Sequence, residues 1–173
     1  MLEEQGLVYF IDTSALVDLH KSHPPRNFPG VWRDMGELVG SGRLRTIDLV
    51  KEECHDEEVI EWFASYPEVV IKPFREQEDC VRQIMSDVLQ TGKQFVNVQS
   101  LDSDADPFII ACVMAHNLLE SGSFASGRHV LVQHENAANP SPKKLKIPDV
   151  CGWYSVRHVR AIGVIQSENW VYP

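Results

Sequence analysis

The pattern of apolar and polar residues along the chain predicts short strands that alternate with helices. Five successive apolar residues at 7–11 indicate a strand that is buried on both faces. Shorter strands are expected at 43–47, 69–71 and 130–132, and the loop at 92–103 has room for another at 95–98. Apolar residues recur at helical spacing in five segments, at 15–21, 31–39, 48–66, 76–90 and 108–119. Residues 150–170 predict a helix, a strand and a short final helix.

Two acidic residues stand where helices are expected to begin. Asp48 is predicted to cap the helix that runs to about Tyr66. Asp106 is followed by Pro107, so we expect an acidic cap with proline at the first helical position. The helix that follows Asp106 is apolar nearly all round and is predicted to be central and buried.

This alternation predicts an α/β fold with three α/β/α layers around a central, mostly parallel sheet of four to five strands. The length of 173 residues suits one hydrophobic core, so we expect a single domain over 1–173. No apolar run approaches the roughly 20 residues that a membrane helix needs. The first residues show no signal peptide, and the four cysteines form no CxxC pair. These features predict a cytoplasmic protein with reduced thiols and no membrane partner.

The formal net charge of −9 argues against a large basic surface wrapped around nucleic acid. It leaves open a nucleic-acid enzyme whose carboxylates are neutralised by a divalent cation, and it also fits a partner with a basic surface.

Four acidic residues occur where this fold would bring them together. Asp12 follows the first strand and Glu135 follows the strand at 130–132, so both are expected at the carboxyl edge of the sheet, where open α/β sheets bind ligands. Glu53 falls on the apolar stripe of its helix, and Asp106 opens the most buried helix. Carboxylates gathered in this way repel one another, and a hard cation such as Mg²⁺ or Mn²⁺ relieves the repulsion.

Each of these acids also has an ordinary structural explanation. Asp12 and Asp106 can serve as helix caps. Glu53 lies in the acidic run 52–58, which is typical of a solvated helix face, and Glu135 can be a loop charge. The metal-site hypothesis therefore depends on the four acids acting together.

Taken in order, these residues resemble the PIN domain. The resemblance is carried by Asp12-Thr13-Ser14, by Glu53 three residues after Val50, by the run Asp106-Pro-Phe-Ile-Ile-Ala and by Glu135 at a strand end. The segments 28–32 and 146–151 look like a less-studied bacterial branch of PIN-like proteins, so the resemblance covers nearly the whole chain. Members of the PIN family are metal-dependent ribonucleases, and many are VapC-type toxins of toxin–antitoxin pairs.

The resemblance implies that Asp12, Glu53 and Asp106 are catalytic metal ligands for Mg²⁺ or Mn²⁺, with Glu135 as a fourth acid that binds directly or through water. Thr13 or Ser14 would be the hydroxyl that orients Asp12. The family usually has Thr two residues before the fourth acid, whereas this chain has Gln133, whose longer side chain can displace the site or weaken activity.

The implied reaction is metal-assisted hydrolysis of an RNA phosphodiester, without a covalent nucleophile. Substrate contacts are expected from cations in loops, at Arg26, Lys143, Lys144 and Lys146. The implied partners are an RNA substrate, a cognate antitoxin protein and a second copy in a homodimer.

Two other functions remain open from the sequence. A catalytically silent PIN-like binding module would act through protein contacts, which Gln133 and the acidic composition favour. A DNA-directed or structure-specific nuclease would use the same four acids. The sequence shows no HExxH zinc motif, no phosphate-binding glycine loop and no GxSxG nucleophile motif.

Overall fold

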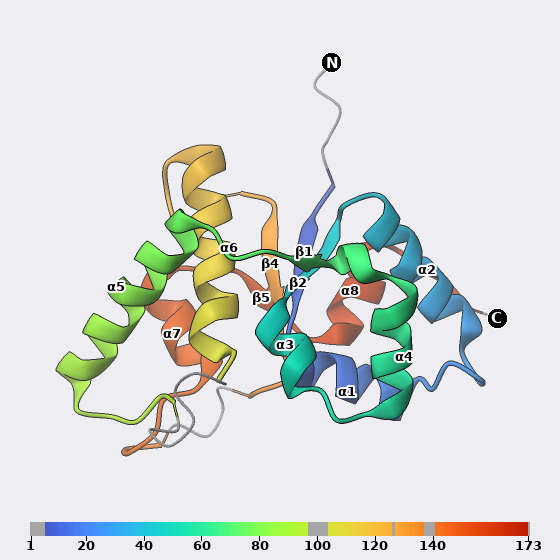
Figure 1. The fold of residues 1–173 in the computed structure, drawn as a ribbon, viewed down its shortest axis with the longest axis horizontal. Helices are drawn as coiled ribbons and strands as arrows, with labels where there is room; N and C mark the ends of the chain where they lie inside the picture. The colour runs from blue at the N-terminus through green and yellow to red at the C-terminus, as the bar shows by residue number, and fades with distance from the viewer. Residues whose placement is uncertain (1–5, 97–103, 126, 137–140, 173) are drawn as a thin grey trace.

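A computed structural model describes residues 6–96, 104–125, 127–136 and 141–172. In this part of the chain, five parallel strands form one sheet in the order β3-β2-β1-β4-β5 (Figure 1). The strands are β1 (Val8–Ile11), β2 (Leu44–Ile47), β3 (Val70–Ile71), β4 (His129–Val132) and β5 (His158–Val159). Strand β1 is central and all four of its residues are buried, as the run of apolar residues predicts. The predicted parallel sheet of four to five strands is confirmed.

Helices cover both faces of the sheet and complete the predicted three-layer α/β/α fold. Helices α5, α6 and α7 lie on one side of the sheet, and α1, α2, α4 and α8 lie on the other (Figure 1). Their bounds are α1 (Thr13–Ser22), α2 (Pro29–Gly40), α3 (Asp48–Glu53), α4 (Glu57–Ser65), α5 (Arg75–Thr91), α6 (Asp106–Ser121), α7 (Ile147–Tyr154) and α8 (Ala161–Ser167). A short 3₁₀ turn, η1 (Pro67–Val69), precedes β3. None of the described helices is both long enough and apolar enough to cross a membrane.

Helix α6 is the most buried helix, as its sequence predicts. It packs between the sheet and α5, and its residues from Ile109 to Ala115 are fully buried. Its apolar residues surround the helix because both of these neighbours exclude water from it. All four cysteines are buried and free, in agreement with the prediction of reduced thiols.

The single helix predicted over 48–66 is wrong. The chain leaves the helical conformation after Glu53 and starts a second helix at Glu57. Asp56 causes the restart, because its side chain accepts a hydrogen bond from the backbone N–H of Val59 at 3.2 Å and caps α4. The apolar spacing continues through the break because α3 and α4 both pack against α1.

Two predicted caps are also one residue out of place. Ile47 and Ala105 occupy the cap positions, while Asp48 and Asp106 are the first residues of α3 and α6. The possible strand at 95–98 is reduced to an isolated bridge between Gln94 and Lys144, and residues 97–98 lie outside the described part of the chain.

Candidate active site

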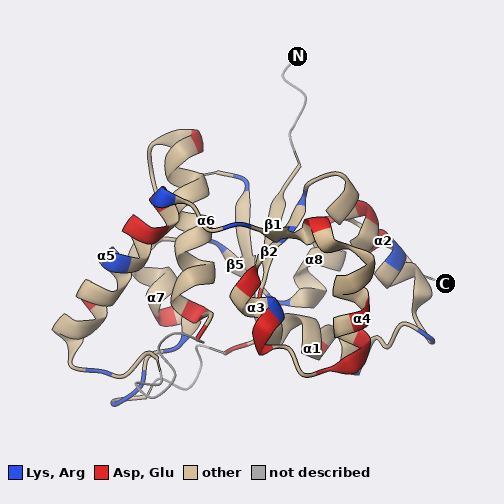
Figure 2. Cartoon of the chain, viewed as in Figure 1, with Lys and Arg blue, Asp and Glu red and all other residues tan. Residues whose placement is uncertain are grey.

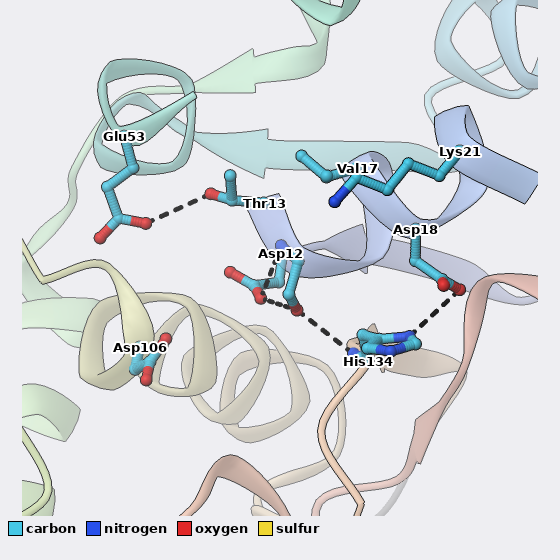
Figure 3. A pocket seen from close by; sticks show the side chains of 9 residues that line it. Asp12, Thr13, Val17, Asp18, Lys21, Glu53, Asp106 and His134 are labelled. Carbon is cyan, nitrogen blue, oxygen red and sulfur yellow. Dashed lines mark hydrogen bonds and ion pairs between the residues drawn. The ribbon is translucent and has the colours of Figure 1, made fainter. Parts of the chain in front are cut away.

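A pocket of about 560 Å³ opens at the carboxyl end of the central strand β1. Figure 3 shows the side chains around it, which come from α1, α3, the start of α6 and the residues after β4. The lining residues are Asp12, Thr13, Ser14, Val17, Asp18, Lys21, Glu53, Asp106 and His134. We call this the acid pocket. Three of the four acids predicted for the site line it.

Asp12 lies between the last residue of β1 and the first residue of α1. It is only 3% exposed, and burial raises the pKa of its carboxyl group. Its Oδ2 accepts hydrogen bonds from the backbone N–H of Ser14 at 3.2 Å and from the Ser14 hydroxyl at 2.5 Å. The Ser14 hydroxyl also accepts a bond from the backbone N–H of His134 at 3.2 Å. Asp12 therefore caps α1 and at the same time faces the acid pocket.

Glu53 is the last residue of α3 and connects three segments of the chain. Its Oε1 accepts a hydrogen bond from the backbone N–H of Ala105 at 2.7 Å, and its Oε2 lies 3.2 Å from the Thr13 hydroxyl that donates to it. Burial raises the pKa of Glu53, and the charge of Asp12 adds to this effect. The break after α3 thus leaves Glu53 in the pocket, while the rest of the acidic run continues toward α4.

Asp106 is the carboxylate that the local structure explains least. It lies one residue inside α6, so its side chain does not cap the helix, and its carboxyl group forms no hydrogen bond with another described residue. Burial, followed by the charges of Asp12, Asp104, Glu135 and Glu53, raises the pKa of Asp106 to about 8. A carboxyl group in this setting is stabilised either by a proton or by a cation.

Glu135 and Gln133 follow β4, but neither residue lines the acid pocket. Glu135 Oε2 accepts a hydrogen bond from the backbone N–H of Ile147 at 2.7 Å, at the start of α7. Its charge still raises the pKa of both Asp12 and Asp106. Gln133 is buried, and its Nε2 lies 3.2 Å from Nδ1 of His158 on β5.

The donor set of the acid pocket fits a hard divalent cation. Its carboxylate oxygens are the ligands that Mg²⁺ and Mn²⁺ prefer, and the half-buried Asp106 carboxyl group has no hydrogen-bond or ion-pair partner among the described residues. No group of three or more His, Cys, Asp or Glu side chains in the described ranges is arranged to hold an ion directly. One or two carboxylates with several retained waters is a normal arrangement for Mg²⁺, and the pocket has room for those waters.

The acid pocket also contains basic groups that the sequence analysis missed. Lys21 extends along α1 toward Thr13 and Asp12 (Figure 3), and it forms no hydrogen bond or ion pair with a described residue. His134 Nδ1 lies 3.1 Å from Asp18 Oδ2 and 3.0 Å from a guanidinium nitrogen of Arg160. Because α1 begins directly after Asp12, the helical spacing of Ser14, Val17, Asp18 and Lys21 was the available signal for this face of α1.

None of the four cations predicted to contact substrate lines the acid pocket. Arg26 is exposed between α1 and α2, where it donates to Asn27. Lys143 and Lys144 are exposed beside Gln94, and Lys146 Nζ donates to the backbone carbonyl of Asn136 at 3.0 Å. Acidic residues gather around α3 and the start of α4, whereas basic residues are scattered over the molecule (Figure 2).

Comparison with known proteins gives a family but no activity. No curated protein and no solved structure has detectable similarity to the chain. Residues 9–172 match the family described as "Domain of unknown function (DUF4411)", a span that runs from β1 to the residues after α8. The chain therefore belongs to the DUF4411 family.

Proposed function

We propose that this protein is a Mg²⁺- or Mn²⁺-dependent endoribonuclease that hydrolyses RNA phosphodiester bonds at the acid pocket. The observation that carries the proposal is the half-buried Asp106 carboxyl group, which has no hydrogen-bond donor among the described residues and lies near the charges of Asp12, Glu53 and Glu135. The charged form of such a group raises the energy of the folded protein unless a proton or a cation compensates it. The resemblance to PIN-domain ribonucleases supports the choice of RNA as the substrate.

Each residue of the acid pocket would have a distinct role in this reaction. Asp12 and Asp106 would hold the cation, while Ser14 fixes the orientation of Asp12. Thr13 and the backbone of Ala105 fix Glu53 beside them. A bound divalent cation supplies an activated water and stabilises the charge that develops on the phosphate. The ammonium group of Lys21 lies in the pocket and is unpaired among the described residues, so it would bind a phosphate oxygen of the substrate.

We infer the cellular setting from the resemblance and the thiols together. Four buried, free cysteines suit a reducing compartment, so the cytoplasm is the proposed location. The proposed partners are RNA, a cognate antitoxin protein of basic surface and a second copy in a homodimer, and the protein would be the toxin of the pair.

The first test is a calorimetric titration of Mn²⁺ into the wild type and into Asp12→Asn. Asn preserves the cap of α1 but removes the charge, so we expect Mn²⁺ binding to the wild type to be lost in the variant while the fold remains intact. Glu61→Gln on the exposed face of α4 is the matched control and should bind Mn²⁺ as the wild type does. No binding to the wild type at millimolar Mn²⁺ would refute the metal site.

A cleavage assay with RNA and DNA substrates distinguishes the proposed ribonuclease from a DNA-directed nuclease. We expect Mn²⁺-dependent cleavage of single-stranded RNA and its loss in Asp12→Asn and Asp106→Asn. Preferential cleavage of DNA of the same sequence would show that the substrate is DNA and not RNA. The proposed metal-dependent hydrolysis would still hold.

A catalytically silent binding module is the second candidate. It is favoured by the position of Glu135, which bonds to the start of α7, and by the lack of a direct three-ligand group among the described residues. Under this alternative, Mn²⁺ binding and cleavage would both be absent, and the carboxylates would serve only as caps and as contacts to a basic partner.

A further inference from the structure

A second pocket lies beside the acid pocket, at the carboxyl ends of β2 and β3. Its volume is about 320 Å³, which is at the lower end of the range of small-molecule sites. Apolar walls come from Leu49, Pro73 and Phe108, and Gln77 on α5 is the polar residue buried among them. The proposed reaction makes no use of this pocket.

Gln77 carries an unsatisfied hydrogen-bond acceptor. The residue is 3% exposed, and its Nε2 donates to the backbone carbonyl of Phe108 at 3.1 Å. This bond fixes the amide orientation, because the reverse orientation would place two acceptors against each other. The other amide atom, Oε1, is buried without a partner among the described residues. A buried acceptor in this state costs stability unless a ligand donates to it.

The remaining polar groups of this second pocket are acceptors as well. Asp48 and Glu78 contribute carboxylates, and one oxygen of Asp48 already accepts from the backbone N–H of Leu49 at 2.9 Å. A ligand that fits must combine an apolar body with N–H donors. Because Phe108 offers an aromatic side chain, a flat ring is favoured over a flexible aliphatic amine.

The same two helices carry residues of both pockets. Leu49 and Glu53 are four residues apart on α3, which corresponds to about 6 Å along the helix axis. Phe108 and Asp106 are two residues apart on α6, or about 3 Å along its axis. Residues of α3 and α6 therefore line both pockets, with Leu49 and Glu53 one helical turn apart on the same face of α3.

We propose that the second pocket binds a nucleobase that carries an exocyclic amino group, as adenine, cytosine and guanine do. The amino group donates to Gln77 Oε1, and the ring packs against Phe108 and Leu49. The inference rests on the proposed ribonuclease function, since the base would belong to a nucleotide of the RNA whose backbone reaches the acid pocket. Uracil has a carbonyl in place of that amino group, which leaves the ring N3–H as its only donor on this edge, so uracil should bind more weakly.

The test is a calorimetric titration of adenosine and of uridine into the protein in EDTA, so that metal binding plays no part. We expect adenosine to bind and uridine to bind at least tenfold more weakly. Gln77→Leu removes the acceptor and should weaken adenosine binding about tenfold. Gln90→Leu makes the same chemical change at an exposed position of α5 and should leave adenosine binding unchanged.

A second variant keeps the test valid if Gln77→Leu does not fold. Leu49→Trp retains Gln77 but fills the pocket, and it should abolish adenosine binding. Equal binding of adenosine and uridine, or adenosine binding that survives both pocket variants, would overturn the proposal. Absent nucleoside binding together with Mn²⁺-dependent RNA cleavage would overturn the base pocket alone, whereas adenosine binding without any cleavage would support the pocket and refute the nuclease.

Discussion

At the scale of single residues, Asp106 links the stability of the folded protein to pH. Its pKa of about 8 in the folded state lies above the ordinary value of 3.8, so the folded state keeps a proton that the unfolded chain releases. The resulting contribution to stability is complete below pH about 4 and is lost as the pH rises toward 8, at up to about 1.4 kcal/mol per pH unit.

We therefore expect Asp106→Asn to stabilise the metal-free protein. Asn has nearly the same shape but no charge to bury, so at pH 8 its free energy of unfolding should exceed that of the wild type by about 1 to 3 kcal/mol. Urea unfolding in EDTA at pH 5 and pH 8 measures this difference, which should shrink at the lower pH. If the variant and the wild type had the same free energy of unfolding at pH 8, the inference that the charged Asp106 destabilises the metal-free protein would be wrong.

The same residue predicts how metal affinity depends on pH. Below pH 8, a cation at the acid pocket must displace the proton of Asp106, so the affinity for Mn²⁺ should rise by up to about tenfold per pH unit between pH 6 and pH 8. Calorimetry in two buffers of different ionisation enthalpy should detect the released proton. A Kd that is constant over this range would show that Asp106 is not a ligand.

At the scale of elements, the break between α3 and α4 shapes the site. Glu53 reaches the pocket because α3 ends with it, and Asp56 then starts α4 in a new direction. Asp56 Oδ2 also lies 2.9 Å from His20 Nδ1, so this residue joins α4 to α1.

Asp56→Ala should lower the free energy of unfolding by about 1 kcal/mol, which is typical of a lost helix cap. Asp56→Asn keeps the oxygen that accepts from Val59, so it should lose much less. Thermal or urea unfolding of the two variants measures this difference. An equal decrease in the free energy of unfolding of both variants would mean that the charge of Asp56, and not its hydrogen bond to Val59, stabilises the start of α4.

At the scale of the whole molecule, the net charge of −9 limits how the proposed RNA substrate could bind. The cations at the acid pocket are few, with Lys21 in its lining and Arg160 beside His134. Binding should therefore involve only one or two neutralised phosphates, and specificity must come from other contacts, such as the proposed base pocket.

This predicts a weak salt dependence for RNA affinity. With one or two phosphate contacts, the logarithm of the binding constant should fall with the logarithm of salt concentration at a slope of about −0.7 to −1.4. Fluorescence anisotropy of a labelled RNA with the Asp106→Asn variant gives this slope without cleavage. Lys21→Gln should reduce the slope by about 0.7, and Arg26→Gln, distant from the acid pocket, should leave it unchanged. A slope near −5 would require a basic surface that the described part of the chain does not show.

The fold class and three of the acids that line the pocket were predictable from the sequence. The apolar run at 7–11, the buried pattern of α6 and the alternation of strands with helices depend on local periodicity, which the sequence displays directly. The position of Asp12 could be predicted because it directly follows the central strand. In a parallel sheet the carboxyl ends of all strands lie at the same edge, where ligands bind.

The contacts between polar groups of separate segments could not be predicted in this way. Local periodicity carries no information about how separate segments pack. Packing determines the helix break after Glu53, the hydrogen bond between Glu135 and α7, and the presence of Lys21 and His134 in the lining of the acid pocket. The second pocket was even less predictable from the sequence, because Leu49, Gln77 and Phe108 come from three different helices. The unsatisfied oxygen of Gln77 exists only because packing removes water from it, whereas in the sequence it is one more glutamine on an amphipathic helix.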